Sequence, residues 1–98
     1  MITEIAEIEV KPGTEEKLIA GVESCKPIFA RAPGFRGLEL HHSIEHPQNF
    51  VLQVKWDSVA HHMEQFQKSA DFALFAVGVG EYLAGKPKLQ HTNTVVAI

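Results

Sequence analysis

Apolar and polar residues alternate along several stretches of the chain, and this period of two is typical of β-strands. In the first stretch, residues 2 to 10, the two kinds of side chain take opposite sides: Ile2, Ala6, Ile8 and Val10 against Thr3, Glu7 and Glu9. Two further stretches, residues 38–44 and 50–56, are joined by the turn sequence "EHPQN" and predict a hairpin. The final run, "KLQHTNTVVAI", is rich in β-forming residues and predicts a last strand with an apolar end.

Two regions between these strands have the helical period of 3.6 residues instead. In the first, one face is formed by Leu18, Val22, Cys25 and Phe29. Thr14 is expected to cap this helix, and Pro27 predicts a kink or an early end within it. In the second, Asp57 or Ser58 is expected to cap one helical segment and Ser69 to begin another. The face of that last segment is formed by Phe72, Phe75 or Ala76, Val79 and Leu83.

The predicted order is β-α-β-β-α-β, which is the split βαβ or ferredoxin-like arrangement. We therefore expect an α+β fold in which a four-stranded antiparallel sheet carries its helices on one face. No repeat or low-complexity segment interrupts the pattern, so residues 1–98 are interpreted as one domain. The uncovered face includes Ile5, Val51 and part of the terminal strand. We expect a twofold homodimer to bury it, formed through the open sheet face and the C-terminal strand.

Composition narrows the classes of partner. The chain has 98 residues, a formal net charge of -3 and nine Lys and Arg, so it lacks the basic face of a nucleic-acid-binding protein. No apolar run approaches the ~20 residues that a membrane span needs, and the N-terminal sequence does not resemble a signal peptide. Cys25 is the single cysteine, and it is interpreted as a packed side chain. These features indicate a cytoplasmic protein with neither a membrane nor a nucleic-acid partner.

The candidate chemistry centres on Trp56 and the adjacent histidines that follow it. His62 shares a helical face with Val59 and Phe66, so it is expected to point at the sheet. His61 lies on another face and is expected to point at water. Trp56 ends the apolar face of its strand, where we expect a core aromatic ring that also forms a pocket wall beside His62.

Two further histidines are candidates for the same site. His42 shares the predicted inward face of Leu38 and Leu40, and His91 opens the last strand on a face that the sequence does not determine. Together with His62 they would suit proton transfer, because imidazole titrates near neutral pH. No pair has the helical spacing of a zinc motif and no carboxylate completes a site, so no metal is expected. The acidic residues of the first strand are interpreted as a solvated or dimer-facing surface: Glu4, Glu7 and Glu9.

Several short motifs, in this order and spacing, resemble the antibiotic biosynthesis monooxygenase (ABM) domains of the dimeric α+β barrel group. They are "KPGTEE" before the first helix, "APGFRG" before the hairpin, "WDS" at the end of the third strand and "PKLQH" at the start of the last. Within "HMEQFQKSADF", the matching positions are His62, Phe66, Ser69 and Phe72. The resemblance implies a homodimer whose two sheets form a central barrel, with a pocket between sheet and helices in each subunit.

ABM-like proteins differ in activity, because a fold does not fix a function. Some oxidise polycyclic phenols to quinones with molecular oxygen and neither metal nor flavin, whereas others degrade haem, act on quinols, isomerise small signalling molecules or have no known activity. The haem-degrading branch has an asparagine on its first strand and a histidine about ten residues after the strand Trp. This chain has no asparagine in residues 2–10, and Phe66 stands ten residues after Trp56. The quinone-forming branch has an asparagine near that Trp, whereas here the nearby asparagine is Asn49, in the predicted turn.

The motifs and the resemblance lead to a functional hypothesis. We expect a monooxygenase-like enzyme that acts on a small aromatic or quinol-type molecule without a cofactor. Its pocket would be lined by Trp56, Phe66, Phe72 and Leu40. His62 is the first candidate for the general base, with His91 or His42 as the second. Two alternatives on the same dimeric fold are a non-catalytic small-molecule-binding domain and an isomerase that acts on a small hydroxy-ketone.

Overall fold

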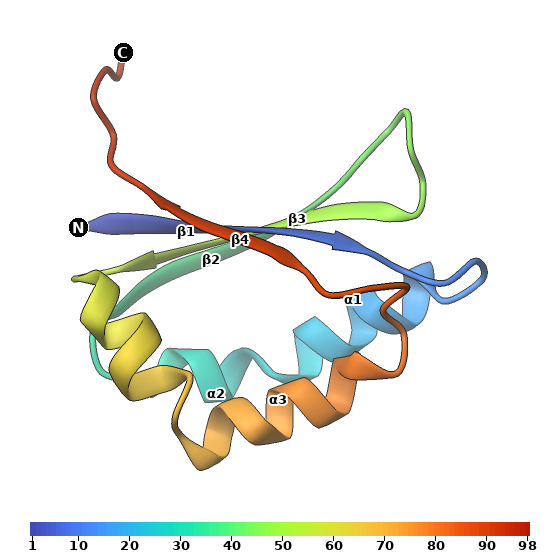
Figure 1. Cartoon of the computed structure of the whole chain (residues 1–98), viewed down its shortest axis with the longest axis horizontal. Coiled ribbons are helices and arrows are strands. Elements are labelled where there is room, and N and C mark those ends of the chain that lie inside the picture. Colours follow the sequence, from blue (N-terminus) through green and yellow to red (C-terminus); the bar gives the residue numbers. More distant parts are fainter.

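The computed structural model describes residues 1–98, and Figure 1 shows its strands and helices in the predicted order. The strands are β1 (Ile2–Glu9), β2 (Phe35–His42), β3 (Asn49–Trp56) and β4 (Lys88–Thr92). They form one antiparallel sheet in the order β2-β3-β1-β4. The predicted α+β, ferredoxin-like fold is therefore confirmed.

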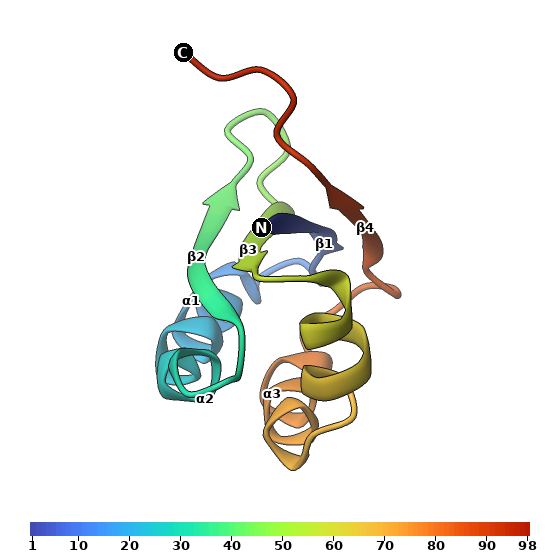
Figure 2. The ribbon, with the colours of Figure 1, turned by 90° about the vertical axis from the view of Figure 1, so that its left-hand side faces the viewer.

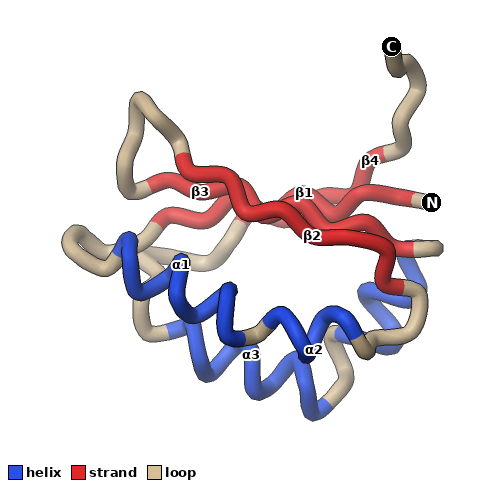
Figure 3. The backbone as a smooth tube through the Cα atoms, turned by 180° about the vertical axis from the view of Figure 1, so that it is seen from behind, coloured by secondary structure: helices blue, strands red, loops and turns tan.

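The helices cover one face of this sheet only. They are α1 (Glu15–Ser24), α2 (Lys26–Ala30), the π-helix η1 (His61–Phe66) and α3 (Ala70–Gly80). Figures 1 and 3 show from opposite sides that all of them lie below the strands, and Figure 2 separates α1 and α2 under β2 from α3 on the side of β4. The other face of the sheet carries no helix, as the sequence predicted.

Several helix ends follow the sequence signals. The first helical region breaks at Cys25, and Pro27 lies in the first turn of α2, where its missing N–H is tolerated. Ser69 caps α3, because its hydroxyl oxygen accepts a hydrogen bond from the Phe72 backbone N–H at 3.0 Å. Thr14 occupies the N-cap of α1, as expected, but its side chain makes no capping hydrogen bond: the hydroxyl donates to the Lys11 carbonyl at 2.6 Å, within the turn that precedes α1.

The core lies between the sheet and the helices. Its apolar side chains come alternately from the central strands, as the period of two requires, and from one face of each helix. The buried apolar residues are Ala6, Ile8, Val10, Leu18, Val22, Cys25, Phe29, Phe50, Leu52, Val54, Trp56, Phe66, Phe75 and Val79. The choice left open between Phe75 and Ala76 on α3 is settled in favour of Phe75, because Ala76 is exposed.

The C-terminal strand is shorter than its sequence suggests. Pairing with β1 covers β4 only, and residues 93–98 leave the sheet on the uncovered side (Figure 1). Their apolar side chains are almost fully exposed: Val95, Val96 and Ile98. The face of α3 is also shorter than expected, since the helix ends at Gly80 and Leu83 instead pairs with Val10 in an isolated bridge.

Candidate functional site

His62 is held against Trp56 by the wide turn of η1. The backbone N–H of Gln67 donates to the His62 carbonyl at 2.8 Å, which is the i+5 spacing of a π-helix, a form that is frequent at functional sites. This turn directs both His62 and Phe66 to the sheet, so the predicted inward orientation of His62 is confirmed by its exposed fraction of 2%. The imidazole stacks on the Trp56 indole, with ring centroids 5.5 Å apart and an angle of 14° between the planes.

A glycine lets η1 approach the sheet this closely. Gly34 has φ +80°, and a Cβ atom placed there would lie 2.4 Å from the ring of His61. That ring does not point freely at water, as the helical pattern suggested, because it is half-buried and its Nδ1 is 2.8 Å from the Ser58 hydroxyl. The same hydroxyl accepts the His61 backbone N–H at 3.3 Å, so Ser58 rather than Asp57 caps this segment.

Glu4 joins the cluster, contrary to the expectation that it lies on a solvated or dimer-facing surface. It is 6% exposed and shares the inward face of β1 with Ala6 and Ile8. The Trp56 indole N–H donates to Glu4 Oε1 at 3.0 Å, and His62 Nε2 lies 3.2 Å from the same oxygen. The sequence already indicated this position, because Glu4 falls on the same side of the alternating strand as Ala6 and Ile8.

His91 connects this buried group to the edge of the sheet. It lies opposite Glu4 in the β1–β4 register, on the edge strand, and is half-buried. Its Nε2 is 2.8 Å from His62 Nδ1, so one of these two nitrogens donates a hydrogen to the other. The result is a continuous polar chain that leads from Glu4 in the core, through His62, to His91 at the edge.

Burial shifts the proton affinities of the two inner members in opposite senses. Removal from water raises the pKa of Glu4 to about 7, although the hydrogen bond from Trp56 opposes this rise. Removal from water lowers the pKa of His62 to about 4, and the charge of a protonated His91 acts in the same direction. At neutral pH the His62 imidazole is therefore uncharged, while Glu4 is close to the midpoint of its titration.

Three of the four predicted lining residues lie together, but they fill the space between them. Trp56 is 0% exposed and Phe66 is 3% exposed, with ring centroids 5.2 Å apart, and Phe72 packs edge-on against Phe66 at 5.6 Å. The indole is covered by these rings and by the stacked His62 imidazole, and neither Trp56 nor His62 lines either of the two pockets described below, whereas the sequence predicted a hollow between them. Phe72 is partly exposed, and His91 is the member of the polar chain that solvent reaches most easily.

Leu40 and His42 lie elsewhere. The hairpin register pairs His42 with Phe50, whereas Trp56 pairs with Phe35 at the opposite end of the same strands. His42 stacks on Phe50 with centroids 4.2 Å apart, and its Nε2 is 2.6 Å from the Pro47 carbonyl oxygen. Both residues line a separate pocket of about 270 Å³ between β2 and α1, with Ile19, Val22, Glu23, Lys26, Leu38 and Phe50.

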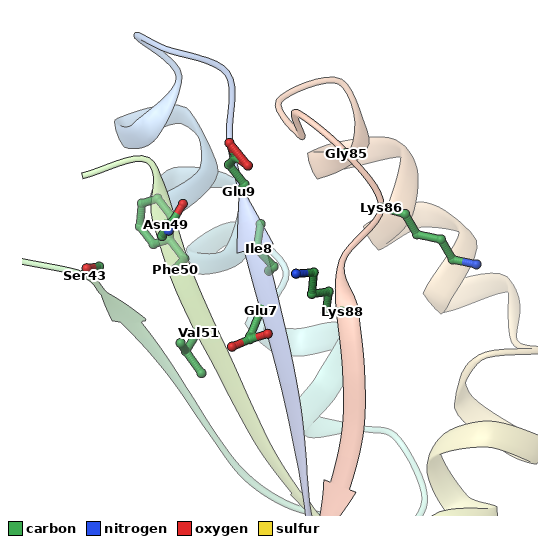
Figure 4. Close-up of a pocket in the computed structure, with 10 residues that line it drawn as sticks. All are labelled: Glu7, Ile8, Glu9, Ser43, Asn49, Phe50, Val51, Gly85, Lys86 and Lys88. Atoms are coloured by element: carbon green, nitrogen blue, oxygen red, sulfur yellow. The ribbon is translucent and has the colours of Figure 1, made fainter. Parts of the chain in front are cut away.

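A larger hollow of about 400 Å³ lies beside the strands, away from the histidine pair (Figure 4). It is bordered by the ends of β1 and β3 and by residues 85–88. Figure 4 shows the Lys88 side chain extending toward β1, near Glu7, and the Lys86 side chain pointing away from the strands. The lining carries both signs of charge, from Glu7, Glu9, Lys86 and Lys88.

The polar chain is not arranged as a metal site. No group of three or more His, Cys, Asp or Glu side chains is placed to hold a metal ion. In the chain described above, each nitrogen of His62 points at a neighbouring side chain, so the ligand atoms do not converge on a common point. No helix is both long enough and apolar enough to cross a membrane.

Comparison with known proteins agrees with this architecture. The family model described as antibiotic biosynthesis monooxygenase matches residues 1–77. A Bordetella bronchiseptica crystal structure, named as a candidate antibiotic biosynthesis monooxygenase, is 45% identical with a TM-score of 0.96, over 97% of both chains. A candidate of the same description from Nitrosomonas europaea shares the fold at 17% identity, with a TM-score of 0.84 over 96% of this chain and 89% of that one.

A more distant relative is YczJ of Bacillus subtilis, a protein described as uncharacterised. It is 22% identical over 95 residues, which cover 97% of this chain and all of that protein. The family model matches residues 1–77, and the Bordetella structure matches 97% of the chain at 45% identity. The chain therefore belongs to the antibiotic biosynthesis monooxygenase family.

Proposed function

We propose that this protein is a cofactor-independent monooxygenase-like enzyme that acts on a small aromatic or quinol-type molecule, with a histidine as the general base. The observation that carries the proposal is the polar chain from buried Glu4 through His62 to half-buried His91. An imidazole at the edge of the sheet, hydrogen-bonded to a second one, is the type of side chain that most often acts as a general base.

His91 is the member that meets the substrate in this proposal. His62 was the first candidate from the sequence, but its ring is 2% exposed and both of its nitrogens face protein side chains. His91 engages His62 through Nε2, which leaves Nδ1 for a ligand. The aromatic rings of Trp56, Phe66 and Phe72 stand behind the pair, and the partly exposed Phe72 is the natural contact for an aromatic substrate.

The chemistry begins with transfer of the phenolic proton to His91. The phenolate is electron-rich and reacts with molecular oxygen, while the protein orients it against His91 and Phe72. In a monooxygenation, one oxygen atom enters the product as a carbonyl oxygen and the other leaves as water. In the simpler oxidation of a hydroquinone to a quinone, oxygen leaves as hydrogen peroxide, so the product identifies the reaction.

Oxygen uptake with hydroquinones and anthrone-like phenols tests the proposal. His91→Gln is expected to reduce the turnover rate by about 100-fold or more, the usual contribution of a general base. His46→Gln is the matched control, because His46 is an exposed histidine in the β2–β3 turn. Equal rates for wild type and His91→Gln, or no uptake by wild type with any of these phenols, would contradict the proposal.

One observation favours a non-catalytic binding domain instead. The rings of Trp56, His62 and Phe66 are buried, with His62 and Phe66 packed against the indole, and a packed polar network can serve stability alone. Under this alternative, His91→Gln leaves the affinity for aromatic ligands unchanged and no phenol is turned over. The isomerase alternative needs the same base but no oxygen, so turnover of a hydroxy-ketone under nitrogen would support it.

We also propose that two copies associate through the open sheet face and the C-terminal segment. The support is the uncovered face of the sheet, on whose side the C-terminal segment leaves β4 (Figure 1), and the exposed apolar side chains of that segment, Val95, Val96 and Ile98. Sedimentation equilibrium is expected to give twice the chain mass, and removal of residues 93–98 to weaken the association. A chain that sediments as a monomer at all concentrations would contradict this arrangement.

A further inference from the structure

Glu4 is the only carboxyl group among the buried residues, and it lies at the inner end of the histidine chain. We propose a proton relay in which His91 takes a proton from the substrate and passes one on to His62. His62 in turn passes a proton to Glu4, which is the final acceptor. This inference rests on the proposed function, since it names the destination of the proton in that reaction. Glu4 acts at a distance from the substrate, so it is a proton store rather than a group that contacts the reacting atoms.

The geometry supports transfer in two steps. His62 Nδ1 is hydrogen-bonded to His91 Nε2 at 2.8 Å, and His62 Nε2 is in close contact with Glu4 Oε1 at 3.2 Å. A neutral imidazole carries a hydrogen on one nitrogen and a lone pair on the other. His62 can therefore accept a proton from His91 on one side and release another to Glu4 on the opposite side, without holding a net charge before or after.

The proton balance closes without an additional reactant. Before the reaction Glu4 is ionised, both histidines carry their hydrogen on Nε2, and His91 Nδ1 has a lone pair. The substrate proton binds His91 Nδ1, the hydrogen on His91 Nε2 moves to His62 Nδ1, and the hydrogen on His62 Nε2 moves to Glu4. Afterwards Glu4 is protonated and both histidines carry their hydrogen on Nδ1. The negative charge has moved from Glu4 to the phenolate oxygen.

The surroundings of Glu4 hold no permanent cation that would keep it ionised. Two titratable groups face it, His62 from η1 and His91 from β4, while β3 contributes the Trp56 indole N–H. The lysines of the adjacent strands, Lys55 and Lys88, pair with residues 3 and 7 of β1, whose side chains point away from Glu4. Both lysines therefore lie on the other face of the sheet. Burial alone therefore raises the pKa of Glu4 to about 7, which suits reversible proton uptake near neutral pH.

A structural role would not require an acid at this position. The contact with Trp56 needs only an oxygen that accepts one hydrogen bond, and glutamine supplies the same oxygen without a charge. An ionisable group in the core carries a penalty for desolvation that glutamine avoids. What the Glu4 carboxyl can do and a glutamine amide cannot is take up and release a proton. The relay depends on this property.

Nitrogen-15 NMR of the full chain tests the relay independently of any enzyme activity. As the pH rises through about 7 and Glu4 ionises, both His62 and His91 are expected to change from the Nδ1–H to the Nε2–H tautomer. A carbon-13 titration of the Glu4 carboxyl should have the same midpoint. Rings that keep one tautomer throughout, or a His62 imidazolium paired with ionised Glu4 at neutral pH, would overturn the proposal.

Kinetics of Glu4→Gln provide the second test, with the exposed turn residue Glu45→Gln as the control. Glutamine keeps the oxygen that both Trp56 and His62 contact, but its amide cannot take up a proton, so the relay loses its final acceptor. We expect turnover to fall about 100-fold, KM to stay level and the rise of kcat/KM through about pH 7 to disappear. A variant that keeps this rise would overturn the relay. If wild type itself consumes no oxygen, the proposed function fails and the NMR titration still decides the relay.

Discussion

Replacement of Glu4 by glutamine should stabilise the fold above about pH 7, even though it removes a buried group that makes two close polar contacts. Glutamine keeps the oxygen that accepts the Trp56 N–H, so the packing of the site changes little. The change removes the ionised carboxylate, which the folded state must hold in the core at high pH. The free energy of unfolding therefore depends on pH differently in the two proteins.

The sign and size follow from the pKa of Glu4. In the unfolded chain the carboxyl ionises above its ordinary pKa of 4.5, whereas burial raises the folded-state pKa to about 7. Between these values the folded state binds more protons than the unfolded state, so wild-type stability falls as pH rises. Each pH unit between these two pKa values lowers the free energy of unfolding of wild type by 1.36 kcal/mol, or up to about 3 kcal/mol in all. This loss is complete above about pH 7 and absent below about pH 4.5.

His62 opposes this trend in the wild-type protein. Burial lowers its pKa from 6.5 to about 4, so between these values the unfolded state binds more protons and stability rises with pH. The two slopes nearly cancel in wild type over the shared range. Glu4→Gln removes the contribution of Glu4 and leaves that of His62. The free energy of unfolding of the variant should therefore rise steadily from about pH 4 to about pH 6.5.

Urea unfolding at about pH 5 and about pH 8 measures the difference. We expect Glu4→Gln to be close to wild type at the lower pH and to have a midpoint about 1–3 M higher at the upper pH, given the usual slope for a small domain. Glu45→Gln should leave both midpoints unchanged, because that side chain is exposed. A glutamine variant that is less stable than wild type at about pH 8, or that differs equally at both pH values, would refute the assignment of Glu4 as a buried, weakly acidic carboxyl.

Three further predictions concern the neighbours of this group. Trp56→Phe removes the N–H that lowers the pKa of Glu4, so a carbon-13 titration should give a higher midpoint than wild type, and an unchanged midpoint would count against the hydrogen bond. Gly34→Ala should lower the free energy of unfolding by about 1–3 kcal/mol, because the new Cβ meets the His61 ring at a positive φ; adding His61→Ala should recover part of the loss. Ser69→Ala should lower it by about 1 kcal/mol through loss of the α3 cap, and urea midpoints equal to wild type would show that the cap contributes nothing.

The periodicity of the sequence was sufficient for the fold, because residues 2–10, 38–44 and 50–56 each have a clear apolar face. The end of the chain was harder to predict. Val95 and Val96 have high β-propensity, but residues 93–98 extend past the N-terminal end of β1 and find no strand to pair with. Propensity measures a preference for extended backbone and does not supply the hydrogen-bonding partner.

The site was predictable in part. Parity placed His42 on the inward face with Leu40, and both do line a pocket on that side. The hairpin register, which the turn sequence already implied, separates His42 from Trp56 by the length of the strand, so this member could have been excluded from the sequence. His91 could not be placed, because its proximity to His62 depends on the β1–β4 register and on the π-turn of η1, and neither has a clear local signal.

Glu4 is the residue through which a catalytic role and a structural role for this cluster can be separated. If the polar chain exists for stability, substitution of its only carboxyl should weaken the fold at every pH and leave the tautomers of the histidines as they were. If it exists to move a proton, the same substitution should strengthen the fold above about pH 7 while it abolishes the coupled tautomer change. Opposite changes in stability and proton exchange within one variant follow from a buried acid that is retained for its proton, because packing alone would favour glutamine.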